Sequence, residues 1–241
     1  VLQSIGPKYA QDYVSRFGFD AEKHPPYLTM ALGAGSVTLW QMARAYSVFA
    51  NGGFLIQPYF IQRIVDDRGN PLGEAKPVHA GEESLRVIDA RNAFIMDSML
   101  QDVTRYGTAA RVAKLGRRDL AGKTGTTNDF IDAWFCGYQP NLVGIAWVGF
   151  DQPKSLGRNQ TGGAVSLPIW LGFMEKVLKG VEEIDRAVPP GVVSARIEDS
   201  ASALSNDSRG SEWFYRENSP AVAPAAGAPE SLHPDRRNQP P

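Results

Sequence analysis

Apolar residues recur at helical spacing in four segments of the chain. This pattern predicts helices over 4–18, 38–51, 89–104 and 168–180. The residues expected to face the core are Tyr9, Tyr13, Val14 and Phe17; Leu39, Met42, Ala43, Tyr46, Phe49 and Ala50; Ile95, Met99, Leu100 and Val103; and Ile169, Trp170, Phe173, Met174, Val177 and Leu178.

The helix over 38–51 has the clearest boundaries. Thr38 and Gln41 have the spacing of a capping box, in which each side chain bonds the other residue's backbone N–H. Gly52 and Gly53 follow at once and end the helix.

Runs of aromatic and β-branched residues predict strands. One strand is expected over 58–66 and a weaker one within 76–88. The runs 133–138 and 143–149 flank Gln139-Pro140-Asn141 and predict an antiparallel hairpin. Short connections between strands, together with separate helices, predict an α+β fold in which helices flank an antiparallel sheet.

The composition changes near residue 190. Residues 1–188 are expected to form the folded domain, and 189–241 a C-terminal extension rich in Pro and Ala. Six prolines fall among the 25 residues 217–241, which hold almost no large aliphatic side chains. Such a segment buries too little apolar area to offset its ordering entropy, so disorder is expected from about 217.

Composition and charge exclude several function classes. Lys and Arg number 25 and Asp and Glu number 26, so the net charge of −1 argues against a nucleic-acid partner. The one cysteine, Cys136, is expected to be buried. His24, His79 and His233 lack the spacing of metal ligands, so we expect no metal and no cofactor. The sequence contains no run of 18 apolar residues, so it predicts no membrane-spanning helix.

The segment Gly122-Lys-Thr-Gly-Thr-Thr127 is the most informative motif. Its first three residues match the end of a phosphate-binding P-loop, but five residues separate Gly116 from Gly122 where that motif has four. A P-loop lysine also opens a helix, whereas here Gly125 follows and the next element is a predicted strand. The spacing therefore argues against a nucleotide site.

The same residues match the K-T-G strand of the serine acyltransferases that react with penicillin. On a strand, Lys123 and Gly125 share one face and Thr124 and Thr126 share the other. A cation and hydroxyls suit a terminal carboxylate, and a glycine lets a peptide approach closely. The tripeptide alone is equally compatible with a lysine in an ordinary turn.

The wider sequence resembles the class A high-molecular-mass penicillin-binding proteins, which are bifunctional peptidoglycan synthases with a glycosyltransferase and a transpeptidase domain. The resemblance covers roughly 1–185 and is strongest over 121–140. Further similar segments occur in the family's order at Leu39–Gly53, Tyr106–Ala110, Trp147–Asp151 and Gly162–Trp170.

This resemblance implies a penicillin-binding, β-lactamase-like transpeptidase fold that is incomplete in this chain. It implies that Lys123 is a protonated catalytic residue that orients the D-Ala-D-Ala end of a stem peptide or the carboxylate of a β-lactam. It also implies that Thr124, Gly125 and Thr126 bind substrate. Thr126 is implied to be catalytic as well, because its backbone N–H would form one half of an oxyanion hole.

Two further motifs of the family, S-x-x-K and S-x-N, do not occur in the chain. The resemblance puts both upstream, so the nucleophile is expected in an upstream part of the same protein. The abrupt apolar start at Val1 is also typical of a piece of a longer chain. We expect the fragment alone to be inactive and the whole protein to lie on the periplasmic face of the inner membrane, held by an N-terminal helix absent from this chain.

The implied function is peptidoglycan cross-linking by serine acyl transfer. Two alternatives stay open: a D,D-carboxypeptidase or β-lactamase-like hydrolase of the same superfamily, and a non-catalytic module that binds wall peptides.

Overall fold

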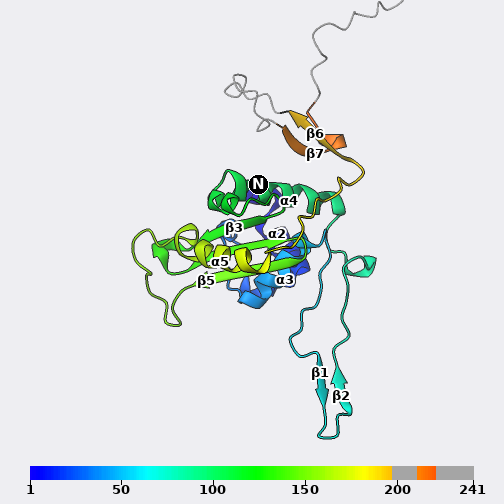
Figure 1. Ribbon diagram of the computed structural model, residues 1–241. Helices are drawn as coiled ribbons and strands as arrows, with labels where there is room; N and C mark the ends of the chain where they lie inside the picture. The colour runs from blue at the N-terminus through cyan, green and yellow to red at the C-terminus, as the bar shows by residue number, and fades with distance from the viewer. Residues whose placement is uncertain (197–210, 221–241) are drawn as a thin grey trace, which may run out of the picture. The chain divides into compact units, whose positions relative to one another are not determined.

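The computed structural model describes residues 1–196 and 211–220. Contacts within the chain divide it into two units, Val1–Pro190 and Gly191–Pro241. The first unit holds most of the helices and the largest sheet (Figure 1).

An antiparallel sheet of three strands lies at the centre of the first unit. Its strands are β3 (Ala121–Thr126), β4 (Ala133–Gln139) and β5 (Leu142–Val148), in the order β3-β4-β5. The predicted hairpin is confirmed, with its tight connection after Gln139, whose side chain accepts the N–H of Asn141. The α+β class is confirmed as well.

Helices cover both faces of this sheet. Helix α5 (Leu167–Val177) packs on one face, and α3 (Leu39–Ala50) and α4 (Ala90–Arg105) pack on the other. The predicted capping box between Thr38 and Gln41 is present at the start of α3. One π-helical turn, η7 (Gly162–Ser166), leads directly into α5.

Three glycines, Gly122, Gly137 and Gly144, lie opposite one another across the three strands and form a glycine row. The row makes room for the indole of Trp170 from α5, since a Cβ on Gly137 or Gly144 would lie 2.8 or 2.7 Å from it. The Trp170 Nε1 donates to the Gly137 carbonyl at 3.3 Å, and Phe135 meets the indole edge-on. The helix therefore docks at one fixed place on the sheet.

The predicted helix over 4–18 is broken in the structure. It consists of α1 (Leu2–Ile5), α2 (Pro7–Val14) and the 3₁₀ turn η1 (Ser15–Phe17). The break occurs because Gly6 has a φ of 87° and Pro7 has no N–H to continue the helix. Two further 3₁₀ turns, η2 and η3, precede α3; they span Ala21–Lys23 and Leu28–Leu32.

The predictions for the next two strands are partly wrong. Strand β1 is only Arg63–Val65, and its partner β2 is Pro71–Glu74, not a strand within 76–88. The Asp66 side chain accepts the N–H groups of Arg68 and Asn70, so the chain reverses directly after β1 and pairs at once. The segment 76–88 holds only the 3₁₀ turn η4 (Glu83–Leu85) and one isolated bridge from Arg86 to Phe54.

Several residues predicted to face the core are exposed instead. The apolar stripe of a helix can be wider than the surface that the helix meets. In α5, Leu167, Trp170, Leu171 and Met174 fill the core, while the outer part of the stripe has no cover among the described residues. The residues predicted wrongly in this way are Tyr9, Leu39, Met99, Ile169, Phe173 and Val177.

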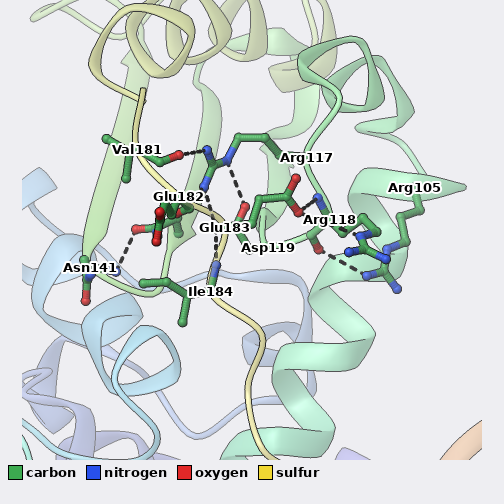
Figure 2. Close-up of polar contacts among 10 residues, drawn as sticks. Arg105, Arg117, Arg118, Asp119, Asn141, Val181, Glu182, Glu183 and Ile184 are labelled. Atoms are coloured by element: carbon green, nitrogen blue, oxygen red, sulfur yellow. Dashed lines mark hydrogen bonds and ion pairs between the residues drawn. The ribbon is translucent and has the colours of Figure 1, made fainter. Parts of the chain in front are cut away.

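The chain after α5 is fixed to the domain by charged side chains (Figure 2). We call residues 181–186 the strap. The Arg117 guanidinium pairs with Asp119 at 2.8 Å and donates to the carbonyls of Val181 and Glu182. The carboxylate of Asp119 also accepts the N–H of Ile184. Arg117 and Asp119 follow the 3₁₀ turn η5 (Ala110–Leu115), so the strap ties this segment to the end of α5.

The end of the strap contacts the two helices that cover the other face of the sheet. Arg186 donates to the carbonyls of Phe49 and Ala50 at the end of α3 and lies 3.6 Å from Asp97 of α4. The Tyr138 hydroxyl donates to the same carboxylate at 2.8 Å. Burial raises the pKa of Asp97, although Arg186 and Tyr138 oppose that rise.

The second unit contains a two-stranded antiparallel sheet that the composition did not predict. Its strands are β6 (Val192–Arg196) and β7 (Ser211–Tyr215), followed by the 3₁₀ turn η9 (Arg216–Asn218). The disorder predicted from about 217 falls mainly on 221–241, which lie outside the described residues.

We expect Asp119→Asn to lower the free energy of unfolding by about 2 kcal/mol at pH 7, because it weakens a buried, charge-assisted pair. Burial raises the pKa of Asp119, but Arg117 and the N–H of Ile184 outweigh it and hold that pKa below its ordinary value. The contribution is therefore complete above about pH 5 and is lost as the pH falls through about 4 and below. Urea denaturation at several pH values measures both effects.

Asp12→Asn is the matched control, since Asp12 pairs with Lys8 on the exposed surface of α2. We expect it to change the free energy of unfolding by less than about 0.5 kcal/mol. Equal urea midpoints for the two variants at pH 7 would show that the strap is not an anchor.

Candidate functional site

The motif singled out in the sequence lies on β3, which is an outer strand of the sheet. Among the described residues, β3 pairs with β4 alone, so its other edge is open. Lys123 and Thr126 are exposed on this edge strand, and Thr124 and Gly125 are half-buried. The strand expected for this motif is therefore present.

The register of the β3–β4 pair separates the side chains by face. Lys123 lies opposite Cys136, which contacts Tyr46 on the α3 side, and Thr124 lies opposite Phe135, which packs under α5. The pairing is continuous through Gly125. The Lys123 Nζ donates to the carbonyl of Thr124 at 3.0 Å and is otherwise open to solvent.

The hydroxyl of Thr124 bonds a residue that sequence reasoning did not assign. The Oγ1 atoms of Thr124 and Thr108 lie 2.8 Å apart. Thr108 is held by the turn that ends α4, where Gly107 packs against the backbone of Val103 and the buried Ala109 donates its N–H to the Val103 carbonyl. The turn therefore presents the Thr108 hydroxyl at a fixed point beside β3.

The hydroxyl of Thr126 bonds the backbone that precedes α5. Its Oγ1 accepts the N–H of Gly162 at 3.0 Å. A Cβ on Gly162 would lie 2.2 Å from the Trp134 carbonyl and 2.5 Å from the Gly125 carbonyl, so only glycine fits there. The Ser166 hydroxyl fixes the end of the same turn by donating to the buried Ala133 carbonyl at 2.7 Å.

The loop after the motif is held in place by hydrogen bonds. Thr127 Oγ1 accepts the N–H of Asp132 at 2.7 Å, and the Asp132 carboxylate accepts the indole N–H of Trp147. Between them, Asp129 and Phe130 have positive φ values of 56° and 54°. These bonds fix the end of β3 and therefore the direction of the Thr126 side chain.

The side chain opposite Lys123 on β4, Cys136, is uncharged. Cys136 is buried as expected, with 2% of its surface exposed. Burial raises the pKa of its thiol to about 12, so the thiol is neutral at physiological pH. Burial also raises the pKa of the neighbouring Tyr46 hydroxyl. The nearby charge on this strand is therefore the Lys123 ammonium.

The arrangement suits an anion more than a metal. In the described part of the chain, no group of His, Cys, Asp and Glu side chains could hold a metal ion. The helices described are too short or too polar to cross a lipid bilayer. An exposed ammonium and two hydroxyls on one strand can bind a carboxylate.

Thr108 and Gly162 belong to segments that resembled the family, but no local pattern could reveal their hydrogen bonds to β3.

Comparison with known proteins points to one family. Residues 1–175 match the sequence profile of the penicillin binding protein transpeptidase domain. The chain is 48% identical over 195 residues to penicillin-binding protein 1A of Neisseria meningitidis, which covers 81% of this chain and 24% of that protein. It is 41% identical over 243 residues to penicillin-binding protein 1A of Pseudomonas aeruginosa, covering 82% of this chain and 30% of that protein.

Solved structures agree. The crystal structure of penicillin-binding protein 1A from Haemophilus influenzae is similar with a TM-score of 0.81 and 34% identity, covering 91% of this chain and 38% of that one. Penicillin-binding protein PonA1 from Mycobacterium tuberculosis is similar with a TM-score of 0.62 and 26% identity, covering 77% and 56%. This chain spans about a quarter of the length of penicillin-binding protein 1A of Neisseria meningitidis.

We expect Gly162→Ala to lower the free energy of unfolding by about 1–3 kcal/mol, because its methyl group meets backbone atoms of β3 and β4 that cannot move without breaking the sheet. Gly172→Ala is the matched control: Gly172 lies within α5 with open space around its Cβ position. That change should stabilise the chain by up to about 1 kcal/mol. Denaturant unfolding of both variants tests the pair, and a stable Gly162→Ala variant would contradict the close approach.

Proposed function

Because this chain belongs to the transpeptidase domain family of penicillin-binding proteins, we propose that it is the C-terminal part of the transpeptidase domain of a peptidoglycan cross-linking enzyme. In this reaction a serine of the whole protein attacks the peptide carbonyl of a D-Ala-D-Ala stem and releases the terminal D-Ala. An acceptor amine then attacks the acyl-enzyme and frees the serine. A β-lactam acylates the same serine.

The observation that carries the proposal is the position of Lys123, Thr124 and Thr126 on the open edge strand β3. Lys123 supplies a positive charge, and the two hydroxyls supply directed hydrogen bonds to the carboxylate of the stem peptide or the β-lactam. Gly125 lies between them and leaves room for a peptide backbone along the strand. The backbone N–H of Thr126 acts as one donor of the oxyanion hole.

The nucleophile comes from an upstream part of the same protein. The chain holds neither S-x-x-K nor S-x-N, and it spans only 24% of its Neisseria relative. The other edge strand, β5, borders an apolar groove of about 480 Å³ between β5 and α5, lined by residues including Leu39, Ile169 and Phe173. These three side chains are exposed in the described chain. If upstream elements of the whole protein cover this groove, they also bury the apolar side chains of α5 that the sheet leaves exposed.

The site of action follows from the substrate. Peptidoglycan stems lie outside the cytoplasmic membrane, and the relatives compared above are bacterial proteins. We infer that the whole protein faces the periplasm and is anchored in the inner membrane by an N-terminal helix upstream of this chain.

A fluorescent penicillin should label the whole protein covalently, whereas the 241-residue chain alone should remain unlabelled on a denaturing gel. The reason is that an acyl-enzyme needs the serine that this chain lacks. A covalent label on the isolated chain would contradict the proposal. In the whole protein, a cross-linked dimer formed from a donor stem and an acceptor amine distinguishes a transpeptidase from a hydrolase, which yields only the shortened stem.

In the whole protein, Lys123→Ala should slow acylation by both a stem peptide and a β-lactam by about 10- to 100-fold, because a charge-assisted hydrogen bond is lost. Its exposed side chain implies a change in the free energy of unfolding below about 1 kcal/mol. Stopped-flow acylation and thermal unfolding measure the two effects. Lys8→Ala, on the exposed surface of α2, is the control and should leave acylation unchanged. An unchanged rate in Lys123→Ala would remove Lys123 from the site.

A further inference from the structure

The two hydroxyls proposed to bind substrate already have partners within the protein. A threonine hydroxyl has one hydrogen atom to donate and two lone pairs that accept. The Thr126 Oγ1 uses a lone pair to accept the N–H of Gly162. A backbone N–H can only donate, so this bond leaves the hydrogen of Thr126 free for another acceptor.

Thr124 is in a different position, because its partner is another hydroxyl. The distance of 2.8 Å between the Oγ1 atoms of Thr108 and Thr124 allows either to donate. If Thr124 donates to Thr108, its one hydrogen is used and an incoming anion meets lone pairs. If Thr108 donates to Thr124, the hydrogen of Thr124 is free, as it is in Thr126.

The surroundings fix the Thr108 oxygen at this distance. Gly107 approaches the Val103 backbone so closely that a Cβ would lie 2.9 Å from the Val103 Cα. Ala109 is fully buried, and its N–H bonds the Val103 carbonyl at 3.1 Å. The Thr108 hydroxyl is thus held between two residues that cannot shift easily, and it can follow Thr124 only by rotating.

We propose that Thr108 is a positioning residue that donates its hydroxyl hydrogen to Thr124, so that Thr124 and Thr126 both point a hydrogen at the carboxylate of a bound substrate or β-lactam. This inference rests on the proposed function, since it requires an anion at β3. Gly162 fixes Thr126 and Thr108 fixes Thr124. Two hydrogen-bond donors are thereby preset without a second positive charge at the site.

The test uses the whole protein that contains this chain and two probes, a penicillin and its methyl ester. The ester keeps the reactive lactam but has no negative charge for the hydroxyls to bind. Thr108→Val removes the hydroxyl and keeps the side-chain shape. We expect it to slow acylation by the free acid about three- to tenfold, the effect of one lost hydrogen bond, while acylation by the ester changes less than twofold.

Four further variants separate a positioning role of Thr108 from a purely structural one. Thr108→Ser keeps the hydroxyl and should restore the rate with the free acid to within about twofold of wild type. Adding Thr108→Val to Thr124→Val should cause no further loss, because Thr108 acts through Thr124. Thr38→Val is the matched control, since its hydroxyl bonds only Gln41, in the capping box at the start of α3, among the contacts described. It should leave the ratio of the two acylation rates unchanged.

Each outcome decides between distinct conclusions. Equal slowing of both probes by Thr108→Val, or additive losses in the double variant, would show that Thr108 has only a structural role. An unchanged rate of acylation by the free acid would show that Thr108 does not position Thr124. If the unmodified whole protein is not acylated by either probe, the proposed function itself fails, and this result does not depend on Thr108.

Discussion

Trp170 packs its indole over two glycines that face each other across β4 and β5. Any side chain on Gly137 or Gly144 would occupy the space of the ring. The Phe135 ring packs edge-on against the same indole. Protein cores are packed too densely for such a ring to move aside. The glycine row therefore determines where α5 lies on the sheet, and the elements joined to α5 are placed with it.

This placement extends to the candidate site through the turn before the helix. Ser166 donates to the buried Ala133 carbonyl, and Gly162 lies against the carbonyls of β3 and β4. The N–H of Gly162 then meets Thr126 at 3.0 Å. A side chain on the surface of the edge strand is thus positioned by packing in the core. The link is made of backbone contacts, for which glycine at position 162 is required.

The sequence could predict the elements whose signals are local. The capping box at Thr38, the hairpin of β4 and β5 and the strand that carries Lys123 each depend on residues a few positions apart. The glycine row depends on the register of three strands, which no local pattern specifies. Likewise, the bond between Thr108 and Thr124 joins residues sixteen positions apart that meet only once α4 packs on β3. Helical periodicity also predicted a buried face of α5 that is wider than the part covered by the described residues, because a periodic stripe does not reveal which element covers it.

The register of β3 also restricts how an anion can be bound. Lys123 lies on the α3 side of the sheet, whereas Thr124 and Thr126 lie on the α5 side. A carboxylate above either face would meet only one kind of group, so one that contacts both must lie at the unpaired edge of the strand. At that edge a peptide can also form backbone hydrogen bonds with β3, as an added strand does. An edge strand with a small residue between the side chains that we propose to bind substrate therefore suits the end of a peptide chain better than it suits a compact anion such as phosphate.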